Sequence, residues 1–123
     1  MYHVTFKSKL NKILQEGLTI GHNRNWHTPF GVMLGDKDKI YLFKRYSSAV
    51  SWGASIEYNT NKKAVILKVN TPLNLEQDTN TGATVGDWYK TTDCITKNNI
   101  LEVIPLTLNL IRELTSGKLE LKD

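Results

Sequence analysis

Tyr2-His3-Val4-Thr5-Phe6 is the stretch that decides how the rest of the chain is read. Tyr2, Val4 and Phe6 alternate with His3 and Thr5, which is the period of a half-buried β-strand. His3 and Thr5 are therefore expected to share one face of that strand. Two later segments, residues 39–52 and residues 86–89, carry the aromatic and acidic groups that we expect the fold to bring toward His3.

The length of the chain predicts a single domain, and its charge bears on the class of partner. The chain has 123 residues, enough to bury a core without disulfides or structural metals, so we expect one domain over residues 1–123 and a monomer. The 16 Lys and Arg outnumber the 12 Asp and Glu, for a formal charge of +4. This charge permits a polyanionic partner such as nucleic acid without indicating one.

The single cysteine indicates a reducing compartment, and the hydropathy pattern predicts no membrane span. Cys94 is the only cysteine, so it cannot form an internal disulfide, and no Cys/His cluster has the spacing of a zinc site. Charged residues interrupt every apolar run, and the first residues lack a signal pattern. We expect a cytoplasmic protein with no membrane partner and no metal site.

The first half of the chain predicts a strand, a short helix and a loop. Ser8 is a candidate N-cap for a helix whose apolar residues recur at helical spacing, and Gly17 is a natural stop. The many turn-forming residues of 19–38 predict a surface loop or pair of loops. Residues 40–43 then read as a buried strand, and Ser47 or Ser48 would cap a helix over residues 49–58.

The second half predicts mainly strands. Alternation is cleanest in residues 63–69, which Pro72 follows. Residues 73–86 form a long polar connection, which in a compact domain is more often functional than idle. Further strands are expected over residues 88–91 and 100–105, and a helix over residues 106–114. Strands in excess, mixed with a few helices, predict an α+β fold.

Taken singly, the chemistry-bearing residues have ordinary structural explanations. A histidine on a strand, such as His3, is more often a hydrogen-bonded core residue than a functional one. His22 and His27 lie in a polar segment without metal-site spacing. Gly-rich phosphate loops, G-x-S-x-G and paired carboxylates at helical spacing are missing from the sequence, which excludes the common nucleotide-hydrolase and serine-hydrolase classes.

Taken in order, the same residues resemble a known superfamily. The chain presents Y-H-V-T-F, I-L-Q-E-G-L, K-I-Y-L-F-K-R-Y-S-S-A-V-S-W, K-A-V-I-L-K-V and D-W-Y-K-T-T-D-C-I-T-K-N-N-I in succession. This order resembles the ADP-ribosyltransferase superfamily, and more narrowly the diphtheria-toxin-like and poly-ADP-ribose-polymerase-like branch with His, Tyr and acidic motifs. The resemblance covers about residues 2 to 105. It implies a split β-sheet sandwich with a few short helices around an NAD cleft.

The resemblance also implies roles for individual residues in binding NAD. His3 would hydrogen-bond the ribose next to nicotinamide, and Thr5 would lie in the segment that grips the nicotinamide amide. Tyr41 and Trp52 would stack on the two faces of the nicotinamide ring, each contact being worth about 0.5 to 2 kcal/mol. Ser47 and Ser48 match small polar residues between the two aromatic positions.

The acidic motif departs from the family, because no glutamate lies in the matching segment. A carboxylate there would stabilise the cationic ribose as nicotinamide leaves. Asp87 is the first candidate for this catalytic role and Asp93 the second, with Thr91 or Thr92 at the position if the strand register slips. An aspartate is one methylene shorter than the usual glutamate.

Two functional hypotheses remain open. The first is an NAD-dependent mono-ADP-ribosyltransferase that releases nicotinamide and modifies a protein side chain, a nucleic-acid base or terminal phosphate, or water, as a toxin-like phage or mobile-element effector. The second is a catalytically inactive binding protein of the same fold that inhibits a host factor through its surface.

Overall fold

The molecule is organised around an antiparallel sheet with strand order β6-β7-β4-β1-β5-β8. The computed structural model describes residues 1–20, 24–28, 31–35, 39–77 and 88–116. The sheet strands are β1 (Tyr2–Phe6), β4 (Ile40–Phe43), β5 (Ala64–Val69), β6 (Glu76–Gln77), β7 (Trp88–Thr91) and β8 (Ile100–Pro105). This α+β architecture confirms the predicted fold class, and the strands predicted at 2–6, 40–43, 88–91 and 100–105 have the observed bounds.

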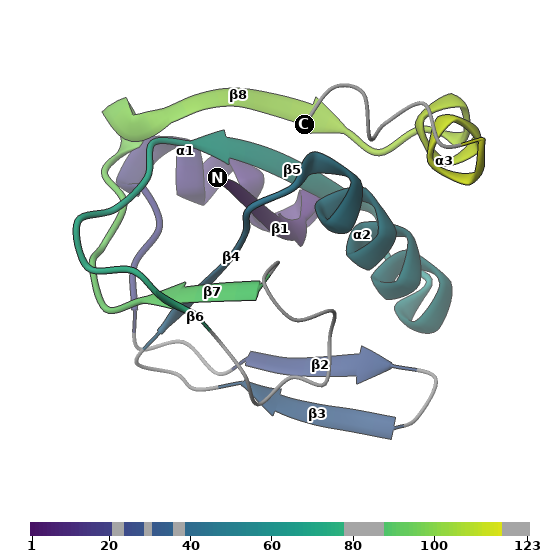
Figure 1. Ribbon diagram of the computed structural model, residues 1–123, viewed down its shortest axis with the longest axis horizontal. Helices are drawn as coiled ribbons and strands as arrows, with labels where there is room; N and C mark the ends of the chain where they lie inside the picture. Colours follow the sequence, from purple (N-terminus) through teal and green to yellow (C-terminus); the bar gives the residue numbers. More distant parts are fainter. Residues whose placement is uncertain (21–23, 29–30, 36–38, 78–87, 117–123) are drawn as a thin grey trace.

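The helices and a separate hairpin complete the fold (Figure 1). The helices are α1 (Leu10–Glu16), α2 (Tyr46–Thr60) and α3 (Leu108–Thr115), with short 3-10 turns η1 (Lys7–Lys9) and η2 (Lys97–Asn99). Strands β2 (Arg24–Thr28) and β3 (Gly31–Gly35) pair as a two-stranded sheet. Every helix in the described ranges is too short or too polar to span a lipid bilayer.

Two predictions about the first half were wrong. Residues 19–38 were expected to be loops, but β2 and β3 pair over five residues each, with Thr28 opposite Gly31. Gly31 and Gly35 lie at the two ends of β3 and do not prevent the pairing. Ser8 does not cap α1, because it lies inside η1 and the residue before α1 is Lys9, which makes no side-chain cap bond.

The sheet separates two apolar cores. The α2-side core contains Val4, Phe43, Ala49, Val50, Ile56, Ala64, Ile66, Trp88 and Leu106. The α1-side core contains Ile13, Leu18, Ile40, Leu42, Leu67, Val69 and Ile95. Because side chains alternate along a strand, β4 and β5 each contribute to both cores.

The middle of the sheet is its least paired seam. Strand β1 pairs with β5 over five residues, from Tyr2 opposite Lys68 to Phe6 opposite Ala64. Its pairing with β4 is confined to Tyr2 opposite Phe43, and Figure 1 shows β4 and β1 next to each other in the middle of the sheet. The strands β6-β7-β4 and β1-β5-β8 thus form two halves joined by a short contact.

Helix ends are fixed by residues that adopt positive φ. Gly17 ends α1 with φ of 80° and donates its N–H to the Ile13 carbonyl over 2.7 Å. Asn61 ends α2 with φ of 56°, a left-handed conformation that asparagine tolerates better than most residues. Helix α2 begins at Tyr46, so neither Ser47 nor Ser48 is its N-cap; both lie in its first turn.

Candidate functional site

His3 lies at the seam between the two halves of the sheet. Its side chain is 1% exposed, and its Nδ1 is 2.9 Å from the carbonyl oxygen of Tyr41. A carbonyl oxygen only accepts hydrogen bonds, so Nδ1 carries the hydrogen and donates it. The imidazole is thereby held in one orientation, and it links β1 to β4 beyond the point where their backbones pair.

Thr5 shares the face of His3, as the alternation predicted. His3 is paired with Leu67 and Thr5 with Val65 on β5, and Leu67 belongs to the α1-side core. Thr5 is also buried. His3 and Thr5 therefore point toward the side of the sheet that α1 covers.

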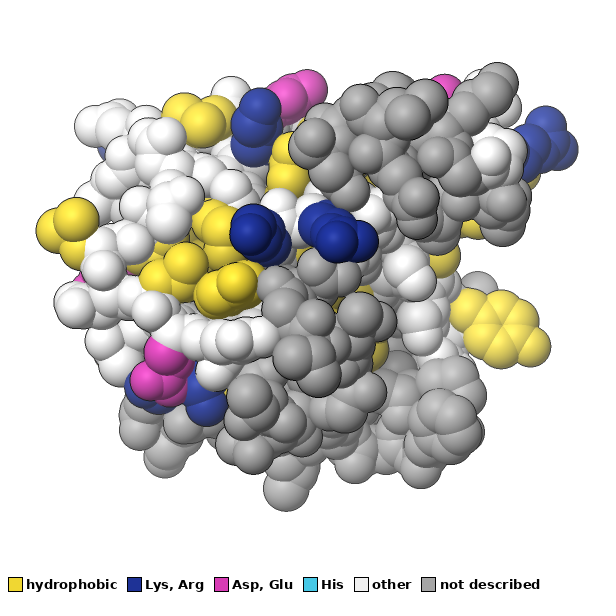
Figure 2. Space-filling model, viewed as in Figure 1, with side chains coloured by type: hydrophobic (Ala, Val, Ile, Leu, Met, Phe, Trp, Pro, Cys, Tyr) yellow, Lys and Arg dark blue, Asp and Glu magenta, His cyan; other side chains and the backbone are white. Residues whose placement is uncertain are grey.

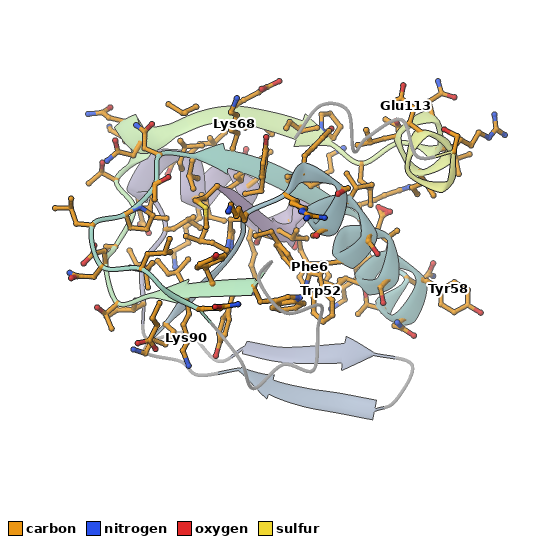
Figure 3. All side chains as sticks on the ribbon, viewed as in Figure 1. Phe6, Trp52, Tyr58, Lys68, Lys90 and Glu113 are labelled. Carbon is orange, nitrogen blue, oxygen red and sulfur yellow. The ribbon has the colours of Figure 1, made fainter. Side chains whose placement is uncertain are left out.

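Tyr41 and Trp52 lie on the opposite side, with α2. Tyr41 alternates with Leu42 of the α1-side core and so shares the face of Phe43. Trp52, on α2, is half-buried and packs against the α2-side core. Its ring centroid is 4.8 Å from that of Trp88 at 80°, and 6.5 Å from that of Phe43. Figure 3 shows Trp52 under α2, facing the sheet.

Ser47 and Ser48 come from the same β4–α2 unit as Tyr41 and Trp52. Ser47 is buried and Ser48 half-buried in the first turn of α2. The structure thus divides the six residues expected to bind NAD by the side of the sheet. His3 and Thr5 face α1, and the remaining four come from β4 and the helix on the other side.

Of the two candidate acids, Asp87 lies outside the described residues and Asp93 is engaged by a loop. Asp93 Oδ1 accepts a hydrogen bond from Asn74 Nδ2 over 2.9 Å, and Oδ2 accepts one from the Asn74 backbone over 3.0 Å. The Asn74 side chain, and then its backbone, hold the pKa of this surface carboxyl below its usual value. Asp93 also donates its own N–H to Thr91 Oγ1 over 3.0 Å, so its contacts fasten the 73–74 segment to the end of β7.

Described residues line several surface hollows, three of which bear on the site. One of about 200 Å³ is lined by Lys39, Glu76, Lys90 and their neighbours, and one of about 390 Å³ by Asn74, Asp93, Cys94 and their neighbours. The third, of about 610 Å³, lies where the end of α2 meets α3 and the start of β5. His3, Thr5, Tyr41 and Trp52 line none of these three.

Sequence reasoning missed two groups of charges. Glu76 Oε1 lies 3.6 Å from Lys39 Nζ and 3.5 Å from Lys90 Nζ, an exposed bridge among three neighbouring strands. Lys9 and Lys62 both lie over the ring of Phe6. The members of each group are far apart in the sequence, so only the strand pairing could have brought them together. Figure 2 shows other basic side chains spread over the face in view, two of them side by side near its centre.

Neither a metal centre nor a related protein identifies the site. In the part of the chain that the structure describes, no three His, Cys, Asp or Glu side chains gather as metal ligands would. Comparisons with family models, with curated proteins and with solved structures gave no match. The assignment of a function therefore rests on the chain's own geometry.

Proposed function

We propose that the protein is a binding module that acts through its surface and does not consume NAD. The observation that carries the proposal is the division of the expected NAD-binding side chains between two sides of the sheet. His3 and Thr5 face the α1 side, whereas Tyr41 and Trp52 belong to the α2 side. A nicotinamide between the two aromatic rings would have the sheet between it and the imidazole.

The packing of these side chains supports the same proposal. Trp52 meets Trp88 edge to face, and Phe43 contacts both rings, an arrangement worth about 0.5 to 1.5 kcal/mol per aromatic pair beyond area burial. His3 is enclosed and bonded to the backbone of Tyr41. Residues that would grip a ligand in an enzyme here stabilise the protein itself.

The contacts of Asp93, the second candidate for the acidic motif, also support the proposal. Both carboxylate oxygens accept hydrogen bonds from Asn74, so approach to a ribose would break bonds that organise the neighbouring loop. Such bonds to an ionised group contribute more than neutral ones. The carboxylate is thus better suited to holding the loop than to stabilising an oxocarbenium-like transition state.

An NAD-dependent mono-ADP-ribosyltransferase is the second candidate, and one observation favours it. The sheet is weakly joined between β1 and β4, and His3 meets Tyr41 at that seam. A split sheet with the histidine and tyrosine motifs at the split is what resemblance to the superfamily implies. In this candidate NAD would enter between the two halves, and Asp87 or Asp93 would stabilise the cationic ribose as nicotinamide leaves.

Incubation with NAD labelled in its adenylate part separates the two candidates. The purified protein, with and without bacterial lysate, is assayed for free nicotinamide and for label on macromolecules, and immobilised protein is used to capture a partner from the same lysate. We expect neither release nor transfer, and retention of a partner that free protein displaces. Nicotinamide release that is lost in a folded His3→Gln variant would establish the enzyme instead.

A further inference from the structure

One end of the molecule gathers positive charge around an aromatic ring. Lys9 Nζ lies 5.9 Å and Lys62 Nζ 5.8 Å from the centroid of the Phe6 ring. Both distances are within the range in which a cation is attracted to a ring face. The two lysines come from segments far apart in the sequence, η1 and the turn between α2 and β5.

The backbone holds these two segments together. Lys7 donates its N–H to the carbonyl oxygen of Lys63 over 2.8 Å, so the four exposed residues Lys7, Lys9, Lys62 and Lys63, here called the lysine cluster, sit on adjoining backbone. Among the described residues no carboxylate lies within ion-pair distance of any of the four ammonium groups. The cluster is therefore a concentration of positive charge available to an external anion.

A hollow with both apolar and polar lining adjoins the cluster. The 610 Å³ hollow is lined by Ala54 and Ile111 and by the polar residues Lys62, Lys63, Asn59, Asn61 and Tyr58. Asn59 Nδ2 donates to the Ser55 carbonyl over 2.8 Å. Tyr58 is 87% exposed, and Figure 3 shows it projecting from the end of α2 away from the rest of the molecule. An aromatic ring this exposed offers a face on which a nucleobase can stack.

Neither an ion pair with Glu57 nor the C-terminus of α2 accounts for all four lysines and the exposed Tyr58. Glu57 lines the hollow, but its Oε1 accepts a hydrogen bond from the Ala64 backbone over 3.2 Å. The C-terminus of α2 attracts nearby cations, which accounts for Lys62 and Lys63. It does not account for Lys7 and Lys9, which belong to a different element, or for the exposure of Tyr58.

We propose that the lysine cluster and the adjoining hollow bind single-stranded nucleic acid, with phosphates on the lysines and a base stacked on Tyr58. An anionic membrane would match the charge alone, whereas Asn61 and the exposed ring of Tyr58 offer a base a polar side chain and a stacking face. The inference rests on the proposed binding function and names its partner class. Phosphate binding by these lysines and base stacking on Tyr58 are not required by the NAD hypothesis.

Fluorescence anisotropy with labelled oligo-dT and oligo-U of about 15 nucleotides tests the proposal. Each lysine–phosphate contact contributes about −0.7 to the slope of log affinity against log salt for a single strand, so a fully engaged cluster gives a slope near −3. The Lys9→Gln/Lys62→Gln double variant should weaken binding about tenfold or more at low salt and reduce the slope by about 1.4. Tyr58→Ala should weaken binding about 5- to 100-fold with the slope unchanged.

The matched control is Lys44→Gln/Lys97→Gln, which removes the same charge elsewhere on the surface. Lys44 follows the end of β4 that pairs with Tyr2, and Lys97 lies near Gly17 at the far end of α1. This variant should bind like the wild type, and thermal melts should show all variants folded. Equal weakening by both double variants, absence of oligonucleotide binding, or binding only to phosphatidylserine vesicles would overturn the proposal. None of these results depends on NAD, so nicotinamide release alone refutes the binding-module function without deciding this site.

Discussion

The turn after α1 requires glycine at position 17. Gly17 has φ of 80° and ψ of −173°, a region that essentially only glycine occupies and that costs other residues about 1 to 3 kcal/mol. A Cβ at this position would also collide with the Ile95 carbonyl oxygen and lie 3.0 Å from the Lys97 nitrogen. These are backbone atoms, so they cannot move aside as a flexible side chain would.

Gly17→Ala is therefore expected to lower the free energy of unfolding by about 2 to 4 kcal/mol. For a domain of this size that loss lowers Tm by roughly 8 to 16 °C. The damage should centre on the bridge in which Leu18 and Ile95 exchange hydrogen bonds of 2.8 and 2.9 Å. Urea unfolding followed by circular dichroism gives the free energy, and a thermal melt gives Tm.

Gly53→Ala is the matched control with the opposite expected sign. Gly53 lies inside α2, where a Cβ would meet Leu106 Cδ2 at 3.4 Å and Val4 Cγ1 at 3.6 Å, both ordinary contacts. Alanine in a helix interior is favoured over glycine by about 0.5 to 1 kcal/mol, so Tm should stay the same or rise slightly. If Gly17→Ala melts like the wild type, or Gly53→Ala loses more stability than Gly17→Ala, the description of the α1 turn is wrong.

Three further predictions concern candidate site residues. His3→Leu keeps the bulk of the side chain but leaves the Tyr41 carbonyl without the imidazole donor, so urea unfolding should show a loss of about 1 to 3 kcal/mol. Trp52 is half-buried, so Trp52→Ala should cost about 2 to 4 kcal/mol by the same measurement, because it removes the contact with Trp88; a loss under about 1 kcal/mol would contradict a packing role for Trp52. Because the folded pKa of Asp93 is lowered, its ionised form contributes stability above the ordinary value of 3.8, and this contribution is lost as pH falls through the lower folded value. Stability measured against pH should therefore fall less steeply on the acid side in Asp93→Asn, and identical acid limbs would contradict the Asn74 contacts.

The elements that could be predicted are those marked by a local pattern of apolar and polar residues. Alternation found β1, and a short apolar run found β4 with its observed bounds, because the side-chain period of a half-buried strand is visible in one sequence. The helix containing Gly53 was predicted over residues 49–58 and extends over Tyr46–Thr60. Gly53 lowers helix propensity, but Ala49, Val50 and Ile56 of α2 are buried in the α2-side core, so tertiary packing outweighs the propensity.

The candidate site was predicted less well, for a physical reason. The sequence placed His3 and Thr5 on one face of a strand, and the structure confirms this. It could not show on which side of the sheet Tyr41 would lie, because that depends on the register of β4 against β1 and on which helix covers which face. Shifting a strand by one residue exchanges its two faces. The motif order therefore carried no information about whether the side chains would meet.

The burial of His3 sharpens the choice between the two functions. A histidine that binds a ribose must exchange its protein contacts for ligand contacts, whereas His3 is 1% exposed and already donates to Tyr41 across the seam of the sheet. Removing the imidazole would take a hydrogen-bond donor away from the Tyr41 carbonyl at the place where backbone pairing is thinnest. This requirement for stability is enough to explain a histidine at position 3 without any nucleotide. The side chains that we propose for recognition, the lysine cluster and Tyr58, lie at the other end of β1, beyond Phe6, so testing them does not disturb His3.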